Sequence, residues 1–220
     1  MNNHQKKVKI WDLPTRLFHW ALVLCVTGAV ISSKIGGNAM VWHIRFGLVV
    51  LALLGFRLIW GMVGPRYARF STLAYSPKII WQHLLQQTSN SLPHAGHSPS
   101  GAASVIAMLS LLLLQTGSGL FSSDSISVEG PLSHLLRDAS ISWLTWLHVT
   151  LQWVLYALVS LHVMAICFYY FAKKINLTRA MLTGYKTGIE TPMATDNRWV
   201  RVIGLTLLSG SIVVLLYLWG

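Results

Sequence analysis

Long apolar runs separated by short polar segments dominate the hydrophobic pattern of this chain. A helix needs about 20 residues to cross the roughly 30 Å hydrocarbon core of a bilayer. Five runs approach or exceed that length: Leu17 to Ser33, Met40 to Gly64, Gly101 to Ser122, Trp143 to Ala172 and Val200 to Trp219. The pattern therefore predicts an all-α integral membrane bundle of about five transmembrane helices.

Composition narrows this prediction to a single membrane domain over residues 1–220. Of the 220 residues, 54% are hydrophobic and only 10% are charged, which is far from the composition of a soluble domain. The formal net charge of +11 would also fit a nucleic-acid-binding protein. The basic residues, however, cluster between the apolar runs. We therefore expect a lipid bilayer, and no nucleic acid, as the partner that explains the charge.

The basic residues also predict the orientation of the chain. Thirteen of the 17 Lys and Arg residues lie in or beside the N-terminal tail, the second connection and the fourth connection, whereas the opposite side has only Lys34 and Arg137. By the positive-inside rule the N-terminus is cytoplasmic. A secretory signal over residues 1–33 is disfavoured because His19 and Trp20 open the apolar run and Lys34 stands where small residues should precede cleavage.

Two connections have a distinct character. The segment 65–100 is rich in proline, and within it Pro77 to Gln87 predicts a short amphipathic helix on the cytoplasmic surface. The outer connection, Ser123 to Ser142, is mildly acidic and is the surface that we expect a redox partner to approach; its acidic residues are Asp124, Glu129 and Asp138.

Four of the nine histidines lie at matched depths in the predicted spans. His148 and His162 are fourteen residues apart in one run, so they share a helix face at a separation of about 21 Å. His19 begins the first span at the cytoplasmic side, and His43 begins the second span at the outer side. An imidazole inside a membrane needs a partner, and haem iron suits it. The depths predict two bis-histidine haem sites, His19 with His162 and His43 with His148.

Other metal chemistry finds less support. No C-x-x-C-H motif occurs, so any haem is non-covalent and held by coordination and packing. Cys25 and Cys167 fall inside spans and are expected to pack as small hydrophobic residues. His94 and His97 have zinc-like spacing but no third or fourth ligand nearby, so we interpret them as ordinary loop histidines.

Two rival functions come from other classes. An intramembrane-histidine metal or proton transporter would ordinarily place acidic residues inside its spans, and none of the six acidic residues is centrally placed in one. A non-redox membrane anchor subunit would not need four histidines at matched depths.

At the level of motifs, the chain resembles the prokaryotic cytochrome b561 family, which includes the b-type cytochrome subunits of nickel-iron hydrogenases. The resemblance rests on Trp11-Asp12-Leu13-Pro14-Thr15-Arg16-Leu17-Phe18-His19-Trp20, the region of His43, Gly96-His97-Ser98-Pro99-Ser100-Gly101, and the spacing of His148 and His162. Related loops often have asparagine where this chain has Ser98, which is a mild departure. The resemblance covers roughly residues 8–175, and a further span over about 200–219 suits the hydrogenase-subunit branch.

This resemblance implies a four-helix core that holds two haem b groups, with iron ligands at His19, His43, His148 and His162. It implies electron transfer between the quinone pool and a periplasmic redox partner, either a c-type cytochrome or a hydrogenase-like enzyme, in a bacterial inner membrane. Both directions of electron flow are compatible with it. The resemblance is also compatible with two kinds of protein: an electron-transfer subunit, and a quinol or quinone oxidoreductase in its own right.

Secondary candidates are two arginines and two glycines. Arg16 lies one turn before His19, and Arg57 follows His43 by fourteen residues; each is a candidate partner for a haem propionate, with lipid phosphate as the alternative. Gly117 and Gly119 would let a haem or quinone approach the third span, although close helix crossing is the more common reason for small residues.

Overall fold

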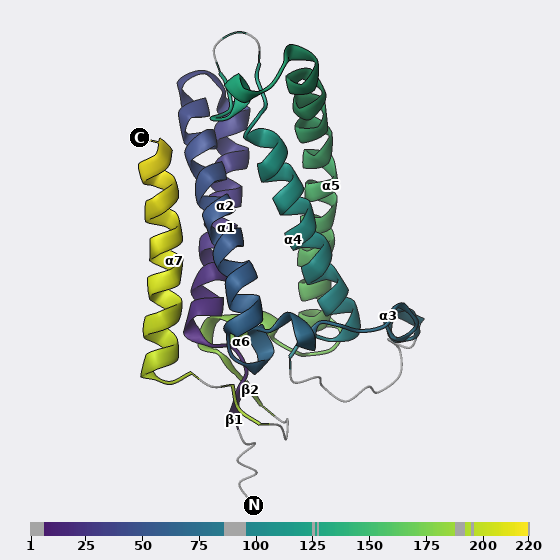
Figure 1. The fold of residues 1–220 in the computed structure, drawn as a ribbon. Helices are drawn as coiled ribbons and strands as arrows, with labels where there is room; N and C mark the ends of the chain where they lie inside the picture. The colour runs from purple at the N-terminus through teal and green to yellow at the C-terminus, as the bar shows by residue number, and fades with distance from the viewer. Residues whose placement is uncertain are drawn as a thin grey trace, which may run out of the picture. The chain divides into compact units, whose positions relative to one another are not determined.

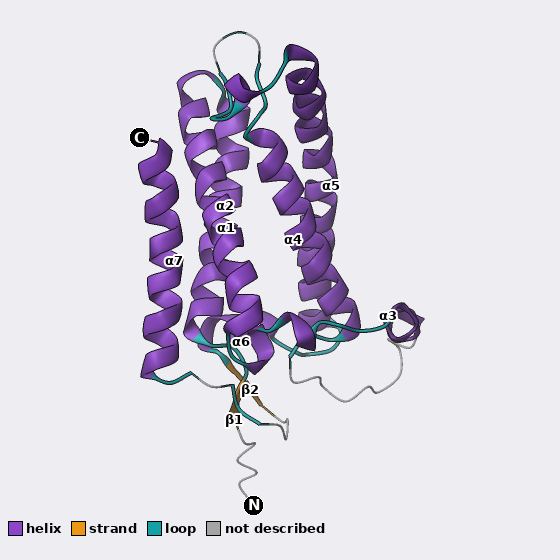
Figure 2. Ribbon diagram, in the orientation of Figure 1, coloured by secondary structure: helices purple, strands orange, loops and turns teal. Residues whose placement is uncertain are grey.

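The computed structural model describes residues 7–85, 96–124, 126, 128–187, 192–194 and 196–219. Within these residues the chain forms seven α-helices and one two-stranded antiparallel sheet (Figure 1). Helices account for nearly all of the regular structure, as the secondary-structure colouring shows (Figure 2). The predicted all-α class is confirmed, and the small sheet was not predicted.

Four helices are long and apolar enough to cross a membrane: α1 (Leu13–Ile35), α2 (Met40–Val63), α4 (Pro99–Gly119) and α5 (Asp138–Phe171). They coincide with the first four predicted spans. Large apolar side chains on them are exposed, for example Leu24 (71%), Ile35 (71%) and Trp153 (64%). Such exposure suits helices that face lipid, where only internally hydrogen-bonded backbone is stable. The chain is therefore a multi-pass membrane protein.

A fifth long helix, α7 (Arg198–Trp219), forms over the expected C-terminal span. Its crossing of the membrane, the total of five spans and the cytoplasmic N-terminus remain predictions. The surface helix is confirmed as a helix, α3 (Pro77–Leu85), with Ile79, Trp81 and Leu85 exposed. Its last two predicted residues, Gln86 and Gln87, lie outside the described residues.

Local signals in the sequence explain where helices begin and end. The Asp12 carboxylate caps α1 by accepting hydrogen bonds from the Thr15 backbone N–H (2.9 Å) and hydroxyl (2.8 Å). Gly36 and Gly37, both at positive φ, form the turn from α1 to the 3₁₀ helix Gly37–Ala39 and α2. The other 3₁₀ helices are Arg66–Ala68, Phe70–Thr72 and Ser133–Leu135.

The chain divides into two compact units. The first comprises Met1–Leu17, Leu58–Ala107 and Ser160–Leu205, and the second comprises Phe18–Arg57, Met108–Val159 and Thr206–Gly220. The long membrane helices each contribute residues to both units. The structure leaves the prediction of a single domain over residues 1–220 untested.

The first unit is organised around the sheet. Strand β1 (Lys7–Lys9) pairs antiparallel with β2 (Tyr185–Thr187), with Val8 opposite Lys186. Helix α6 (Leu177–Thr183) precedes β2 and ends at Gly184, which adopts the left-handed conformation. The buried core of this unit consists of Val8, Ile10, Trp11, Tyr67, Ala180 and Ala194.

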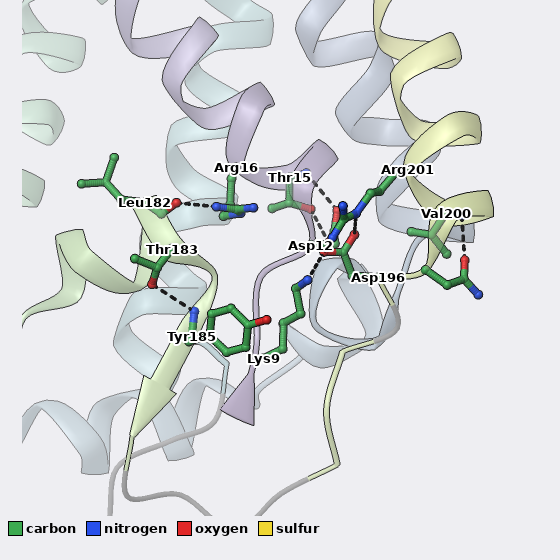
Figure 3. A network of polar contacts seen from close by, with 11 residues as sticks. Lys9, Asp12, Thr15, Arg16, Leu182, Thr183, Tyr185, Asp196, Val200 and Arg201 are labelled. Carbon is green, nitrogen blue, oxygen red and sulfur yellow. Dashed lines mark hydrogen bonds and ion pairs between the residues drawn. The ribbon is translucent and has the colours of Figure 1, made fainter. Parts of the chain in front are cut away.

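A buried carboxylate also joins distant segments of the first unit. The Asp196 side chain is fully buried and forms ion pairs with Lys9 and with Arg201, the latter at 3.1 Å (Figure 3). The segment before α7 is held further by the hydrogen bond from Ala194 N–H to the Lys9 carbonyl (2.8 Å). Strand β1 and the N-terminal end of α7 are thereby connected through one acidic residue.

In the second unit, α1, α2, α4 and α5 pack around an apolar core. Its buried residues are Val50, Leu54, Leu111, Leu112 and Leu155. Partly buried residues of α1, among them Leu22, Cys25 and Val26, complete this core. All four haem-bundle helices of the sequence prediction therefore contribute to one packed cluster.

Candidate cofactor site

Two of the predicted ligands meet inside the second unit. The ring centroids of His43 on α2 and His148 on α5 are 6.0 Å apart, and the rings are inclined at 86°. Metal–nitrogen bonds of about 2 Å on opposite sides of one ion place two axial imidazole ring centres roughly 6 Å apart. The separation thus suits two imidazoles that share one metal ion.

Both imidazoles are oriented by backbone carbonyls. Nδ1 of His43 lies 2.8 Å from the Ala29 carbonyl on α1, and Nδ1 of His148 lies 2.8 Å from the Gln115 carbonyl on α4. A carbonyl can only accept, so each Nδ1 carries the proton and donates. This leaves Nε2 as the basic, ligating nitrogen of each ring, which is the usual arrangement of metal-bound histidine.

Helix α4 adds further contacts to His148. The Gln115 side chain donates from Nε2 to the His148 carbonyl at 3.0 Å, and the same Nε2 lies 3.4 Å from the His148 Nε2. Gly119 lies against the ring, since a Cβ at this position would be 2.8 Å from the His148 Cε1. A Cβ at Gly117 would meet nothing within 4 Å. Of the two candidate glycines, only Gly119 has another group packed closely against it. That group is the His148 ring.

The two histidines border a cavity of about 300 Å³. Its wall is largely apolar, with side chains from α1, α2, α4, α5 and the outer connection; they include Val26, Val30, Met40, Ile44, Leu112 and Val149. Gly47, one turn after His43, also borders the cavity and has open space where a Cβ would stand. An apolar cavity with two convergent imidazoles is suited to a flat, largely apolar cofactor that carries a metal.

The number of potential metal ligands at this site favours a metal held in a macrocycle over a metal ion bound by protein side chains alone. Among the described residues, no group of three or more His, Cys, Asp or Glu is placed to hold a metal. A bare metal ion in a protein ordinarily has three or four protein ligands, whereas haem supplies its own equatorial nitrogens and needs only axial ones. Two histidines with room between helices therefore fit a haem.

The other predicted pair is divided between the units. His19 on α1 belongs to the second unit, where its ring makes an edge contact with Trp20 at 5.1 Å, and His162 on α5 belongs to the first. Both are half-buried. Their pairing on one haem stays a prediction.

The two arginines have partners within the protein. Arg16 donates from Nη1 to the Leu182 carbonyl of α6, as drawn in Figure 3. Arg57 is 4% exposed in α2 and also interacts with other residues of the chain. Propionate binding by either one remains a prediction.

Two histidines outside the predicted spans, His83 in α3 and His97, contact other parts of the protein. His97 packs against Trp11 with ring centroids 4.7 Å apart, and His83 Nδ1 lies 3.2 Å from the Ser100 hydroxyl. His94 lies outside the described residues, so the interpretation of the His94 and His97 pair as ordinary loop residues is untested.

Sequence reasoning missed Ala29 and Gln115. Ala29 could not have been identified from sequence, because its contact is made by a backbone carbonyl, which every residue has. Gln115 could have been noticed, because an amide within an apolar membrane run is costly unless it has a hydrogen-bonding partner.

Comparison with known proteins identifies the family. The family described as "Prokaryotic cytochrome b561" matches residues 10–184. A "Probable Ni/Fe-hydrogenase 1 B-type cytochrome subunit" of Escherichia coli (strain K12) is 28% identical over 143 residues, which is 53% of this chain and 61% of that protein. The protein of the same description in Escherichia coli O157:H7 matches with the same values.

The match thus spans less than two thirds of the length of these relatives. No solved structure matches significantly. The family match covers most of the chain and includes all four predicted histidine ligands. This chain belongs to the prokaryotic cytochrome b561 family.

Proposed function

We propose that this protein is a di-haem cytochrome b that transfers electrons across the bacterial inner membrane, between the quinone pool and a periplasmic redox partner. The observation that supports it most is the His43 and His148 pair, with rings 6.0 Å apart and each Nδ1 donating to a carbonyl. Haem b, when bound, supplies a one-electron iron couple. His43 and His148 would hold the haem iron through Nε2, and the residues that line the cavity would provide an apolar wall.

The second haem of this proposal is held by His19 and His162. The separation of His148 and His162 by fourteen residues on continuous α5 puts two imidazoles on one helix face about 21 Å apart. That distance is a large part of the hydrocarbon thickness. Two haems held at these levels would supply the one-electron chemistry for transfer from one membrane surface toward the other.

The partners follow from the relatives and from chemistry. The Escherichia coli relatives are described as hydrogenase cytochrome subunits, so a hydrogenase-like enzyme is one candidate partner, and a c-type cytochrome is the other. Quinone, as a lipid-soluble two-electron carrier, exchanges electrons from within the bilayer.

Haem stoichiometry tests this proposal. We expect purified protein to yield two haems per chain in a pyridine haemochrome assay, all of them extracted by acid acetone. A value near one would remove the second haem from the proposal. A value near zero, or haem that remains with the polypeptide, would overturn it.

Quinone exchange needs its own test. With the protein in liposomes, a reduced short-chain quinol such as duroquinol should reduce part of the b-type absorbance. A dithionite-reducible spectrum that does not respond to any quinol would contradict the quinone assignment and leave the haem assignment intact.

A further inference from the structure

We propose that Gln115 is a positioning residue for the haem between His43 and His148, and that α4 sets the orientation and the electronic character of His148 without providing a ligand. This inference rests on the proposed haem ligation by His43 and His148. Its starting observation is an asymmetry between the two histidines.

Among the residues that the structure describes, the His43 ring is held by the hydrogen bond from its Nδ1 to the Ala29 carbonyl at 2.8 Å. His148 is held at two points by the same residue of α4. Its Nδ1 donates to the Gln115 carbonyl at 2.8 Å, and its own carbonyl accepts from the Gln115 amide at 3.0 Å. The ring and the backbone of His148 are therefore both tied to one residue.

Space for the ring comes from the next turn of α4. A Cβ at Gly119 would be 2.8 Å from Cε1 and 3.0 Å from Nδ1 of His148, which is closer than van der Waals contact. The ring cannot swing away freely because its Nδ1 is already bonded to Gln115. Gln115 and Gly119, four residues apart on one helix face, together specify the plane of the imidazole.

The Gln115 amide also lies beside the coordinating atom. Its Nε2 is 3.4 Å from the His148 Nε2, the ring nitrogen that is not bonded to the Gln115 carbonyl. The positive end of an amide dipole next to an iron ligand stabilises the more electron-rich, reduced state of the iron. Groups around the ligands tune redox potential in this way, together with solvent access.

The first test replaces the amide. Gln115→Leu keeps the backbone carbonyl, and therefore the Nδ1 hydrogen bond, but removes the side-chain donor with little change in volume. We expect the midpoint potential of one of the two haems to become more negative, and the low-spin electron paramagnetic resonance signal of that same haem to shift as the ring reorients. The other haem should keep both properties.

The matched control is Gln152→Leu. Gln152 also borders the cavity, one turn after His148 on α5, and its side-chain oxygen accepts a hydrogen bond from the Tyr156 hydroxyl at 3.5 Å. It reports the general effect of removing an amide from this cavity. The proposal requires the shift in Gln115→Leu to exceed the shift in Gln152→Leu.

The second test uses the two glycines. Gly119→Ala should lower the affinity for one haem by about tenfold or more, as loss of support for a metal ligand commonly does. Gly117→Ala makes the same change two residues away on the same helix, in open space, and should retain both haems. Haem occupancy and the electron paramagnetic resonance signal measure the difference between the two variants without an electron-transfer assay.

The outcomes separate the inference from the proposal beneath it. Absence of haem in the unsubstituted protein would overturn the proposed function. If that protein holds two haems, yet Gln115→Leu resembles Gln152→Leu and Gly119→Ala resembles Gly117→Ala, then the positioning role of Gln115 is wrong and the haem assignment stands.

Discussion

The Asp196 network of the first unit and the histidine pair of the second unit hold polar groups by opposite arrangements. Both carboxylate oxygens of Asp196 have cationic partners from the protein, Lys9 and Arg201. His43 and His148 each direct Nδ1 to a backbone carbonyl, and both residues border a cavity. A polar group that is fully satisfied internally serves stability, whereas one that keeps a donor orbital for an outside partner serves binding.

This comparison implies that substitutions in the two regions should affect different properties of the protein. Substitutions in the Asp196 network should alter unfolding and leave the haem spectra largely unchanged. Substitutions in the histidine site should alter the spectra first.

The largest stability effect is expected from Asp196→Ala. The substitution leaves the ammonium of Lys9, which is only 15% exposed, without its carboxylate. Removal of one partner from a buried ion pair costs about 3 kcal/mol, and the half-exposed Arg201 adds little. Circular dichroism melts in detergent should show a lower unfolding temperature. The haem absorbance at ambient temperature should be unchanged. An unchanged melt with a lost haem would contradict the division of roles.

A smaller effect is expected from Asp12→Ala. Asp12 is 1% exposed, caps α1 and accepts a hydrogen bond from the Trp60 indole at 3.2 Å. Loss of the cap and of this bond should cost about 2 kcal/mol in total. Asp12→Ser retains capping and is the control. In a double-mutant cycle with Trp60→Phe, additive losses would show that the indole bond contributes nothing.

Acid should weaken the Asp196 network progressively. Burial alone would raise the pKa of Asp196, but the hydrogen bonds and charges of Arg201 and Lys9 outweigh it, so the net pKa is lowered from the ordinary value of 3.8. The stabilisation is therefore complete above the ordinary value and is lost as the pH falls through the lowered pKa. The difference in unfolding temperature between the unsubstituted protein and Asp196→Asn should shrink in that acidic range. A difference that grew there would show the sign to be wrong.

The smallest effect concerns the outer connection. Asp124 has a local role, because its Oδ1 accepts the backbone N–H of Ile126 (2.9 Å) and of Val128 (2.8 Å). Asp124→Asn keeps that acceptor and removes the charge. Combined with Glu129→Gln and Asp138→Asn, it should slow association with a basic c-type cytochrome several-fold at low salt and very little at high salt.

Stopped-flow mixing over a range of salt concentrations measures this rate, and quinol reduction of the haems is the internal control. If the triple variant is unaffected while substitutions at Arg66 and Arg69, on the side predicted to be cytoplasmic, abolish the reaction, the partner binds on that side.

The four long apolar helices and the proximity of His43 to His148 were predictable from sequence for physical reasons. Apolar runs of bilayer length have few alternatives to a helix in lipid. Histidines are so costly within such runs that their depths carry information, and His43 and His148 do lie together. The α3 helix was likewise predicted by its amphipathic pattern and by Pro77.

The tertiary details were not predictable in the same way. Strands of three residues, such as β1 and β2, exist only because distant segments meet. Asp196 lies in a polar stretch where nothing indicates Lys9 as its partner. The contacts of Gly119 and Gln115 with His148 could not be predicted, since small and polar residues within membrane helices have several common explanations.

The assignment of His43 and His148 to one haem is the central claim, and haem counting on ligand variants tests it most directly. His43→Ala, His148→Ala and the double variant should each lose the same one of two haems, identified by its midpoint potential in a redox titration, and should keep the other. Loss of different haems in the two single variants, or loss of both haems in the double variant, would contradict the account.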